Sequence, residues 1–373
     1  MTSDYFPPHF GGVENVTYEI SKKMALNGHE IHVLTSKTEG SLTEEVMEGV
    51  FVHRIDFIDI TRTFGLQTSI SLSFSKELNN LSKQVKPDLI NAQNIFYYST
   101  FIAARNKEKM NYPLVTTLHI GDVDKLGGLS GYIAQTYEKT IGKYIINKSD
   151  RLIAVSQAVR KHALKLNSNE RAIDVIPNAI DSQRFKPRDK KNGNEIKILF
   201  LGRLIQNKGP DQFIEVARKT VNKLPNVSYT LIGDGPMRRT LEEKVSQLKL
   251  NSKIHFLGSV PDVSADLPGY DILVRPSFTE GMPLTLLEGM ASGLVVISYN
   301  IDGVQEIIQN GVTGILAPAG DIEAIIAGIT QLAEDTKLLN AIGTNARKYI
   351  ENYLNWDKVA DMTLESYKKV LDI

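Results

Sequence analysis

Two glutamates separated by seven residues mark the C-terminal half of the chain, within the stretch RPSFTEGMPLTLLEGM. Glu280 follows the apolar run DILVRP, and Glu288 lies further along, in a run of helical character. A carboxylate accepts hydrogen bonds, so such a pair suits the hydroxyl groups of a sugar or a ribose. The spacing therefore predicts a site for a sugar-like ligand. An ordinary pair of surface glutamates on a βα unit is the alternative.

A helix start between the two glutamates adds a site for an anion. Pro283 is placed to be the first helical residue, where its missing N–H costs nothing. Backbone N–H groups at such a helix start point outward and bind phosphate. The residues expected to form this turn are Gly281, Met282, Pro283 and Leu284.

Two cations follow the first apolar run of the same half, in the sequence GRLIQNKG. Arg203 and Lys208 should lie at the carboxyl end of a strand, where open α/β sheets bind ligands. Arginine grips phosphate with two donors, and lysine acts as a point charge. Together they suit a pyrophosphate whose charge grows as it leaves. Two solvated surface charges remain the alternative.

The N-terminal half offers two weaker candidates. Gly11 and Gly12 lie at a loop-to-helix junction, where glycine allows the backbone to approach a phosphate closely; glycine pairs also make ordinary turns. His119 ends the predicted strand PLVTTLH, on the carboxyl side. A lone histidine more often has a structural hydrogen-bonding role.

The sequence predicts neither a metal nor a cofactor. Asp122 and Asp124 form a DxD pattern in a glycine-rich stretch, and two carboxylates alone do not make a specific Mg²⁺ or Mn²⁺ site. No GxGxxG with a trailing acidic residue is present, which argues against a dehydrogenase. The chain has no cysteine, so thiolate ligands and disulfides are excluded.

Short β-rich runs alternate with amphipathic helical runs through both halves. Such alternation predicts an α/β protein with parallel sheets covered on both faces. Residues 174–195 are rich in Pro, Asn, Asp and Lys and are interpreted as a linker with an exposed turn region. We therefore predict two Rossmann-like, doubly wound domains facing across a cleft. Their expected bounds are residues 1–176, joined by a C-terminal helix over 356–373, and residues 177–355.

The beginning of the chain does not fit this pattern well. Only Met1, Thr2 and Ser3 precede the loop that starts at Asp4. A first central strand should be a buried apolar run of about five residues. We therefore expect this strand to be missing, with the edges of its two neighbours unpaired and the true start upstream.

Composition limits the class of protein. Lys+Arg and Asp+Glu both number 43, so no net positive charge favours a nucleic acid partner. Hydrophobic residues make up 42% and charged residues 23%, as in a globular protein. No apolar run is long enough to cross a bilayer, and the N-terminus lacks the pattern of a signal peptide. We expect a cytoplasmic protein, with peripheral contact at the inner face of the membrane as a further expectation.

Taken in order, the motifs resemble family 4 of the GT-B glycosyltransferases, a group of retaining, metal-independent enzymes. The resemblance covers nearly the whole chain and is more specific than any single motif. The matching stretches are GGVE at 11–14, GRL…KG at 202–209, GDGP at 233–236, TEG-x6-E at 279–288 and NG-x-TG-x6-D at 310–321.

The resemblance implies a role for each candidate. Arg203 and Lys208 would hold the donor pyrophosphate, Glu288 the ribose, and Glu280 the transferred sugar. His119 would contact the sugar, and the Gly11–Gly12 turn would close over the phosphate. The reaction would move a hexose-type sugar from a UDP- or GDP-sugar to an acceptor hydroxyl. Attack on the front face would retain the anomeric configuration without a carboxylate nucleophile.

The acceptor and the alternatives are less constrained. SDYFPPHFGGVE is similar to lipid-linked members, the phosphatidylinositol sugar transferases, which implies a glycan or lipid-linked glycan precursor as acceptor. Residues 61–85 can form an amphipathic surface for a membrane, although a core-facing helix is the better interpretation because basic residues are few. The alternative functions are a nucleotide-sugar epimerase of the same fold and a catalytically silent nucleotide-sugar-binding protein.

Overall fold

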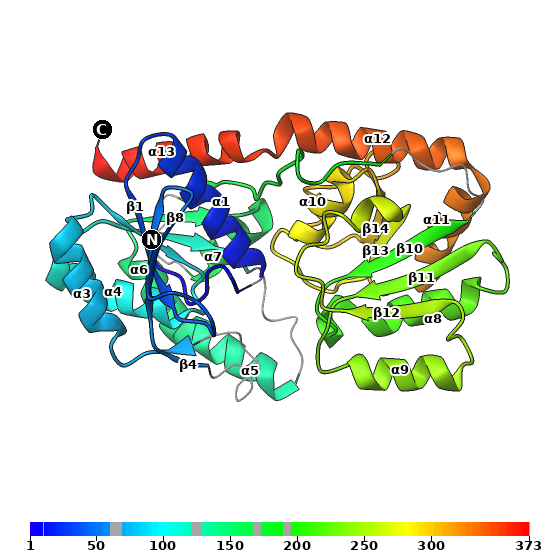
Figure 1. Ribbon diagram of the computed structural model, residues 1–373, viewed down its shortest axis with the longest axis horizontal. Helices are drawn as coiled ribbons and strands as arrows, with labels where there is room; N and C mark the ends of the chain where they lie inside the picture. Colours follow the sequence, from blue (N-terminus) through cyan, green and yellow to red (C-terminus); the bar gives the residue numbers. More distant parts are fainter. Residues whose placement is uncertain (10, 60–68, 121–127, 167–172, 189–194, 373) are drawn as a thin grey trace. The chain divides into compact units, whose positions relative to one another are not determined.

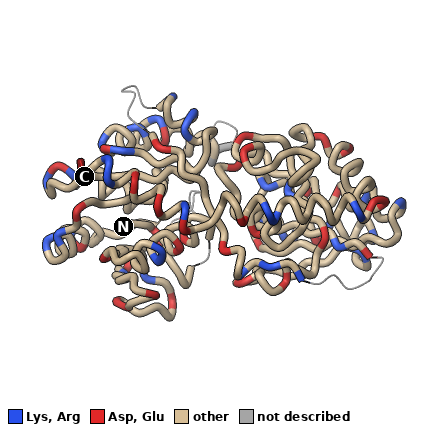
Figure 2. The backbone as a smooth tube through the Cα atoms, turned by 90° about the horizontal axis from the view of Figure 1, so that it is seen from above, with Lys and Arg blue, Asp and Glu red and all other residues tan. Residues whose placement is uncertain are grey.

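The computed structural model describes the chain except for residues 10, 60–68, 121–127, 167–172, 189–194 and 373 (Figure 1). The chain forms two compact units: unit 1 comprises Met1–Asn178 with Trp356–Ile373, and unit 2 comprises Ala179–Asn355. Both boundaries lie within two residues of the predicted ones. Acidic and basic residues alternate along both units, in keeping with the balanced charge (Figure 2).

Unit 2 is built on a six-stranded parallel sheet of order β12-β11-β10-β13-β14-β15. The first strand is central and the order reverses beside it, which is the arrangement of a Rossmann sheet. The strands coincide with the β-rich runs of the sequence, and β13 and β14, which are covered on both faces, are buried throughout. The strands are β10 (Ile196–Leu201), β11 (Val227–Ile232), β12 (Ile254–Gly258), β13 (Ile272–Arg275), β14 (Val295–Tyr299) and β15 (Ile315–Ala317).

Helices alternate with these strands, as the sequence predicts. They are α8 (Pro210–Thr220), α9 (Arg238–Gln247), α10 (Leu284–Ala291), α11 (Ile322–Glu334) and α12 (Thr336–Tyr353). A short 3-10 turn, η3 (Gln206–Lys208), precedes α8, and another, η4 (Leu267–Gly269), precedes β13. Aspartates cap the last two helices, Asp321 at α11 and Asp335 at α12, each accepting a hydrogen bond from a first-turn amide.

Unit 1 contains a second, less regular sheet. Three strands pair in the order β1-β3-β2, and four strands pair in the order β6-β7-β8-β9. Within these two groups the pairing is parallel except between β2 and β3, which is antiparallel. A separate pair joins β4 and β5. The strands are β1 (Ile31–Ser36), β2 (Glu44–Met47), β3 (Val50–Ile55), β4 (Ile58–Asp59), β5 (Ser69–Ile70), β6 (Ile90–Gln93), β7 (Leu114–Leu118), β8 (Arg151–Ala154) and β9 (Ile173–Val175).

The expectation of unpaired strand edges is wrong. Thr2 forms parallel bridges to Leu34 of β1 and to Ala92 of β6. Backbone hydrogen bonds support both bridges: the Thr2 amide donates to the carbonyl of Asn91 in β6, and the Ser3 amide donates to the carbonyl of Leu34 in β1. Residues 1–4 thus fill the central place of the sheet, although they are mostly polar. A strand this short needs only a few ladder bonds to satisfy both neighbours.

The helices of unit 1 position its candidate residues. They are α1 (Gly12–Leu26), α3 (Phe74–Val85), α4 (Tyr98–Met110), α5 (Gly128–Tyr137), α6 (Lys143–Lys148), α7 (Gln157–Leu166) and α13 (Trp356–Leu371), with a π-helical turn, η2 (Glu138–Gly142), between α5 and α6. The predicted face of α1 is buried at Val16, Ile20 and Met24. The C-terminal helix α13 packs against α1 and β8, so the chain ends in unit 1.

The structure bears on two predictions about the surface. Phe74 and Leu78 of α3 are buried, so this helix faces the core, in agreement with the preferred interpretation, whereas residues 61–68 lie outside the described part. The supposed linker is partly interior, because Ile176, Ile180 and Phe185 are buried and its first residues belong to β9. No helix in the described residues is both long and apolar enough to span a membrane.

Candidate functional site

In unit 2 the candidate residues gather where β10 and β13 lie side by side. The strand order reverses at this pair, and the loops that follow both strands emerge at the same edge. The two loops are joined, since the amide of Phe278 donates to the carbonyl of Asn207 over 2.9 Å. Residues distant in sequence therefore share one site, as the positions of Arg203, Lys208 and Glu280 predicted.

Glu280 is held between two cations. Its Oε2 accepts from Lys208 Nζ at 2.7 Å, and its Oε1 accepts from Arg275 Nη2 at 3.0 Å. The glutamate side chain is 7% exposed and that of Lys208 18% exposed. Neither residue is a solvated surface charge, which rules out the surface interpretation for both.

Burial and charge act against each other at this pair. Burial disfavours the ionised form of Glu280, but Lys208 and Arg275 outweigh it and hold its pKa at about 2. Burial also lowers the pKa of Lys208, and the neighbouring Arg275 adds to that effect while Glu280 opposes it. Glu280 is thus a carboxylate whose two oxygens are already engaged.

Arg275, the last residue of β13, is a component of the site that the sequence analysis missed. Its guanidinium donates to Ser277 Oγ at 2.9 Å, to Thr285 Oγ1 at 3.1 Å and to the carbonyl of Leu201. The residue is 4% exposed. Gly202 leaves room for it, because a Cβ there would collide with the guanidinium. A charged residue ending an otherwise apolar strand was the signal available in the sequence.

Arg203 differs from its neighbours because its side chain is exposed. It forms no ion pair with any residue that the structure describes. It nevertheless lies near enough to Lys208 for its charge to lower the pKa of that lysine. Two cations thus pair with one carboxylate and a third lies near Lys208, which leaves the site with an excess of positive charge suited to an anion.

The predicted helix start lies beside this cluster. Pro283 is the N-cap of α10 and not its first helical residue, a shift of one position from the prediction. No side chain caps the helix and its first turn contains no acidic residue. Its first amides therefore keep the partial positive charge of a helix N-terminus. The buried turn before the helix consists of Gly281, Met282, Pro283 and Leu284.

Glu288 lies in the second turn of α10 and is half-buried. Its carboxylate has no hydrogen-bond partner among the residues that the structure describes. Burial raises its pKa to about 7; Arg184 and Arg275 oppose that shift, and Asp262 adds to it. A carboxylate poised in this way gains from a ligand that donates hydrogen bonds to it.

In unit 1, Gly11 and Gly12 lie where the sequence predicted, at the start of α1, with Gly11 as the N-cap. A Cβ at position 11 would collide with the carboxylate of Glu14. Glu14 is buried and accepts from the Tyr97 hydroxyl at 3.2 Å. A larger residue at position 11 would therefore have to displace the Glu14 side chain.

His119 directly follows β7, as predicted, and is half-buried. Its Nε2 lies 2.8 Å from Oε1 of Gln93, at the end of the neighbouring strand β6. Burial lowers the pKa of His119 to about 4, so its imidazole is neutral at neutral pH. Gln93 is a second residue that the sequence analysis did not identify, because only strand pairing places it beside the histidine.

A metal ion in this protein would need several ligating side chains close together. The described residues contain no group of three or more His, Asp or Glu side chains able to hold a metal ion. The DxD pattern at Asp122 and Asp124 lies outside the described residues.

Two family models match the chain, one for each unit. Residues 10–184 match the model described as Glycosyltransferase Family 4, and residues 181–349 match Glycosyl transferases group 1. Together they run through most of the chain, in the order that the motifs indicated. The chain belongs to these GT-B glycosyltransferases, which confirms the predicted family and the α/β fold class.

Relatives of similar sequence that are named as glycosyltransferases or sugar-transferring synthases align with nearly the whole of this chain. An uncharacterised glycosyltransferase of Methanocaldococcus jannaschii is 26% identical, over 99% of this chain and 96% of its own. The GPI3 subunit of phosphatidylinositol N-acetylglucosaminyltransferase from Saccharomyces cerevisiae is 25% identical, over 99% and 82%. The N-acetyl-alpha-D-glucosaminyl L-malate synthase of Bacillus anthracis is 25% identical, over 98% and 95%.

Solved structures share the fold. Sucrose-phosphate synthase from Thermosynechococcus elongatus superposes with a TM-score of 0.84 at 20% identity, covering 97% of this chain and 94% of that one. HepE from Anabaena, solved with UDP-glucose, gives a TM-score of 0.78 at 17% identity, covering 99% and 98%.

Proposed function

We propose that this glycosyltransferase uses a UDP-sugar as donor and transfers a hexose or N-acetylhexosamine unit with retention of configuration. The observation that carries the proposal is the cationic cluster of Lys208 and Arg275 on Glu280, with Arg203 near Lys208, beside the uncapped start of α10. A diphosphate is the anion that fits two or more such donors at once. The UDP-bound neighbour and the N-acetylglucosaminyl relatives favour uridine over guanine as the base.

Each residue has a part in this proposal. Lys208 and Arg203 stabilise the negative charge that develops on the leaving pyrophosphate. Amides at the turn from Gly281 to Leu284 bind a phosphate oxygen. Glu288, whose carboxylate is poised to accept hydrogen bonds, holds the ribose hydroxyls. The Gly11–Gly12 turn closes over the phosphate as a further proposal.

Glu280 is proposed to orient the transferred sugar and not to attack it. Both of its oxygens are engaged by cations, and the pKa of about 2 makes it a weak base. An engaged, weakly basic carboxylate is a poor nucleophile. This supports retention by front-face attack, with the leaving phosphate helping to deprotonate the acceptor hydroxyl. His119 contributes a neutral imidazole toward a substrate hydroxyl.

The acceptor is proposed to be a hydroxyl of a glycan or a lipid-linked glycan precursor. Support comes from the phosphatidylinositol N-acetylglucosaminyltransferase relatives, which match nearly the whole of this chain. Peripheral contact with the inner face of a membrane would follow from a lipid acceptor. The enzyme is further proposed to work without a metal ion, because protein cations occupy the place where a metal would neutralise the diphosphate.

A thermal-shift screen tests the donor assignment first. Purified protein is heated with UDP, GDP, ADP, CMP or NAD, each with and without EDTA. A ligand that binds only the folded protein raises the midpoint according to its affinity. We expect selective stabilisation by UDP that EDTA leaves unchanged. Stabilisation by GDP alone would overturn the uridine assignment, and loss of the shift with EDTA would overturn the metal-independent mechanism.

Incubation with the donor alone then separates transfer from epimerisation. A transferase needs an acceptor other than water for efficient turnover, whereas an epimerase converts the sugar nucleotide by itself. Rapid conversion of UDP-glucose to another sugar nucleotide would therefore contradict the proposal.

A further inference from the structure

The amides of Gln93 and Asn91 form a buried chain that ends at the imidazole of His119. Both residues lie in β6 and are at most 2% exposed. Asn91 Nδ2 lies 3.2 Å from the carbonyl oxygen of Val115 and 3.0 Å from Thr117 Oγ1. Gln93 Nε2 bonds Asn91 Oδ1, and Gln93 Oε1 faces His119 Nε2 at 2.8 Å.

The direction of every bond in this chain follows from its first member. A backbone carbonyl can only accept, so Asn91 must present its NH₂ group to Val115. Its Oδ1 then faces Gln93 and can only accept, which requires the NH₂ group of Gln93 at that position. The Oε1 of Gln93 is left toward His119. Because that oxygen can only accept, the imidazole must carry its proton on Nε2.

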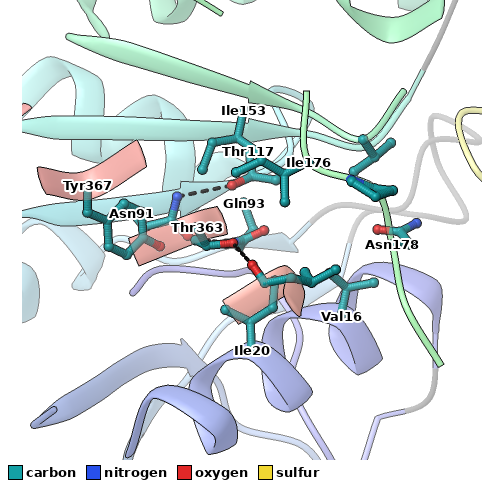
Figure 3. Close-up of a pocket in the computed structure, with 13 residues that line it drawn as sticks. Val16, Ile20, Asn91, Gln93, Thr117, Ile153, Ile176, Asn178, Thr363 and Tyr367 are labelled. Atoms are coloured by element: carbon teal, nitrogen blue, oxygen red, sulfur yellow. Dashed lines mark hydrogen bonds between the residues drawn. The ribbon is translucent and has the colours of Figure 1, made fainter. Parts of the chain in front are cut away.

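The surroundings keep this order in place. Asn91, Gln93 and Thr117 line a pocket of unit 1 together with Thr363 and Tyr367 of α13, and Figure 3 shows the bond from Asn91 to Thr117. The main chain of Gln93 is also fixed, since its amide donates to Thr2 and its carbonyl accepts from Thr100 Oγ1 at 2.9 Å. With so little exposure, bulk water cannot readily replace a partner of either amide.

We propose that Gln93, oriented by Asn91, is a positioning residue that holds His119 with its proton on Nε2 and its Nδ1 lone pair available to a substrate hydroxyl. This rests on the proposed contact between His119 and the substrate. The other tautomer would place an N–H at that position, so the ring would donate to the hydroxyl oxygen and could not accept the hydroxyl proton. Val115 and Thr117, which do not touch His119, thus determine which hydrogen bond it can make.

Nitrogen NMR of the protein labelled with ¹⁵N-histidine tests the tautomer independently of activity. Protonated and unprotonated ring nitrogens give distinct signals, and a His119→Ala sample identifies the residue among the seven histidines. We expect a single Nε2–H tautomer in the native protein. Gln93→Leu should give a mixture of tautomers.

Asn106→Leu is the matched control, because Asn106 is another buried amide of unit 1 and donates to Ser75 Oγ at 2.8 Å. It should leave the His119 signals unchanged. Turnover of Gln93→Leu should fall about threefold to tenfold, as for one lost hydrogen bond, while its affinity for UDP stays constant.

Three results would overturn the inference. A proton on Nδ1 in the native protein, or an unchanged tautomer in Gln93→Leu, would show that Gln93 does not orient the ring. A changed tautomer with undiminished turnover would show that the orientation has no function. If the tautomer changes without loss of turnover, the turnover of His119→Ala shows which proposal is wrong. Undiminished turnover of His119→Ala would mean that His119 does not have its proposed role. A sharp loss of turnover in His119→Ala would mean that His119 has that role but that Gln93 does not orient it for function.

Discussion

The candidate residues of the two units interact in different ways, by ion pairs in unit 2 and by hydrogen bonds between neutral groups in unit 1. In unit 2 the side chains are charged: Lys208 and Arg275 share the carboxylate of Glu280, and Arg203 lies near Lys208. In unit 1 they are neutral, and two amides and an imidazole form one ordered line of hydrogen bonds. Charged groups bind an ionic ligand strongly. A series of hydrogen bonds between neutral groups instead fixes which atom donates and which accepts. Unit 2 is therefore suited to hold a charged ligand and unit 1 to orient a neutral one.

The difference also appears in how burial acts. In unit 2 the opposite charges around Glu280 hold its pKa well below the usual range despite burial. In unit 1 nothing offsets the burial of His119, so its pKa falls to about 4 and the ring stays neutral. Substitutions in unit 2 should consequently have the larger effects on donor use.

Removing the lysine of the cluster tests the charged side of the comparison most strongly. Lys208→Ala deletes a donor aimed at the leaving diphosphate, and we expect turnover to fall roughly 10²- to 10³-fold. Initial rates with a UDP-sugar measure this. Lys219→Ala is the control, since that lysine pairs with Glu323 on the surface of the same unit. Equal turnover in the two variants would show that the cluster is structural only.

Removing the ribose carboxylate should have the next largest effect. Glu288→Ala loses hydrogen bonds between a charged acceptor and the ribose, so we expect the Kd for UDP to rise roughly 10- to 100-fold. Titration calorimetry measures it, with the exposed Glu334→Ala as control. Native protein should prefer UDP over 2′-deoxy-UDP, and Glu288→Ala should lose part of that preference. An equal preference in both proteins would place the ribose elsewhere.

The smallest effect is the pH dependence of donor binding. Burial raises the pKa of Glu288 to about 7, so the free enzyme carries a proton there at lower pH. Only the ionised form offers all its lone pairs to the ribose, and affinity should therefore rise with pH up to that value and then level off. Between pH 8 and pH 6 the Kd for UDP-glucose should increase about tenfold.

A Glu288→Gln variant provides the control for this profile. Its amide does not titrate, so its Kd for UDP-glucose should be nearly constant over the same range. A steep profile that persists in Glu288→Gln would assign the titration to another group.

Much of the local structure was predictable from local sequence. The strand IHVLTS is β1 in full, and the face of α1 through Val16 and Met24 is buried as its spacing indicates. The antiparallel edge strand β2 was missed, because its residues alternate between half-buried and exposed and give no apolar run. The short first strand gives no apolar run either, since residues 1–4 are mostly polar, yet Thr2 pairs on both sides.

The sequence by itself determined the family, the order of strands and helices, and the residue types near the strand ends, because these depend on runs and spacings along the chain. Tertiary structure alone decided which side chains meet. Glu280 is 72 positions from its partner Lys208, and Gln93 is 26 positions from His119. Strand order and register bring these groups together, and both depend on pairing between distant segments. Gln93 acquires a role only through that pairing, so no local pattern could reveal it, whereas the charge of Arg275 at the end of an apolar strand was a local signal whose partners only the pairing defines.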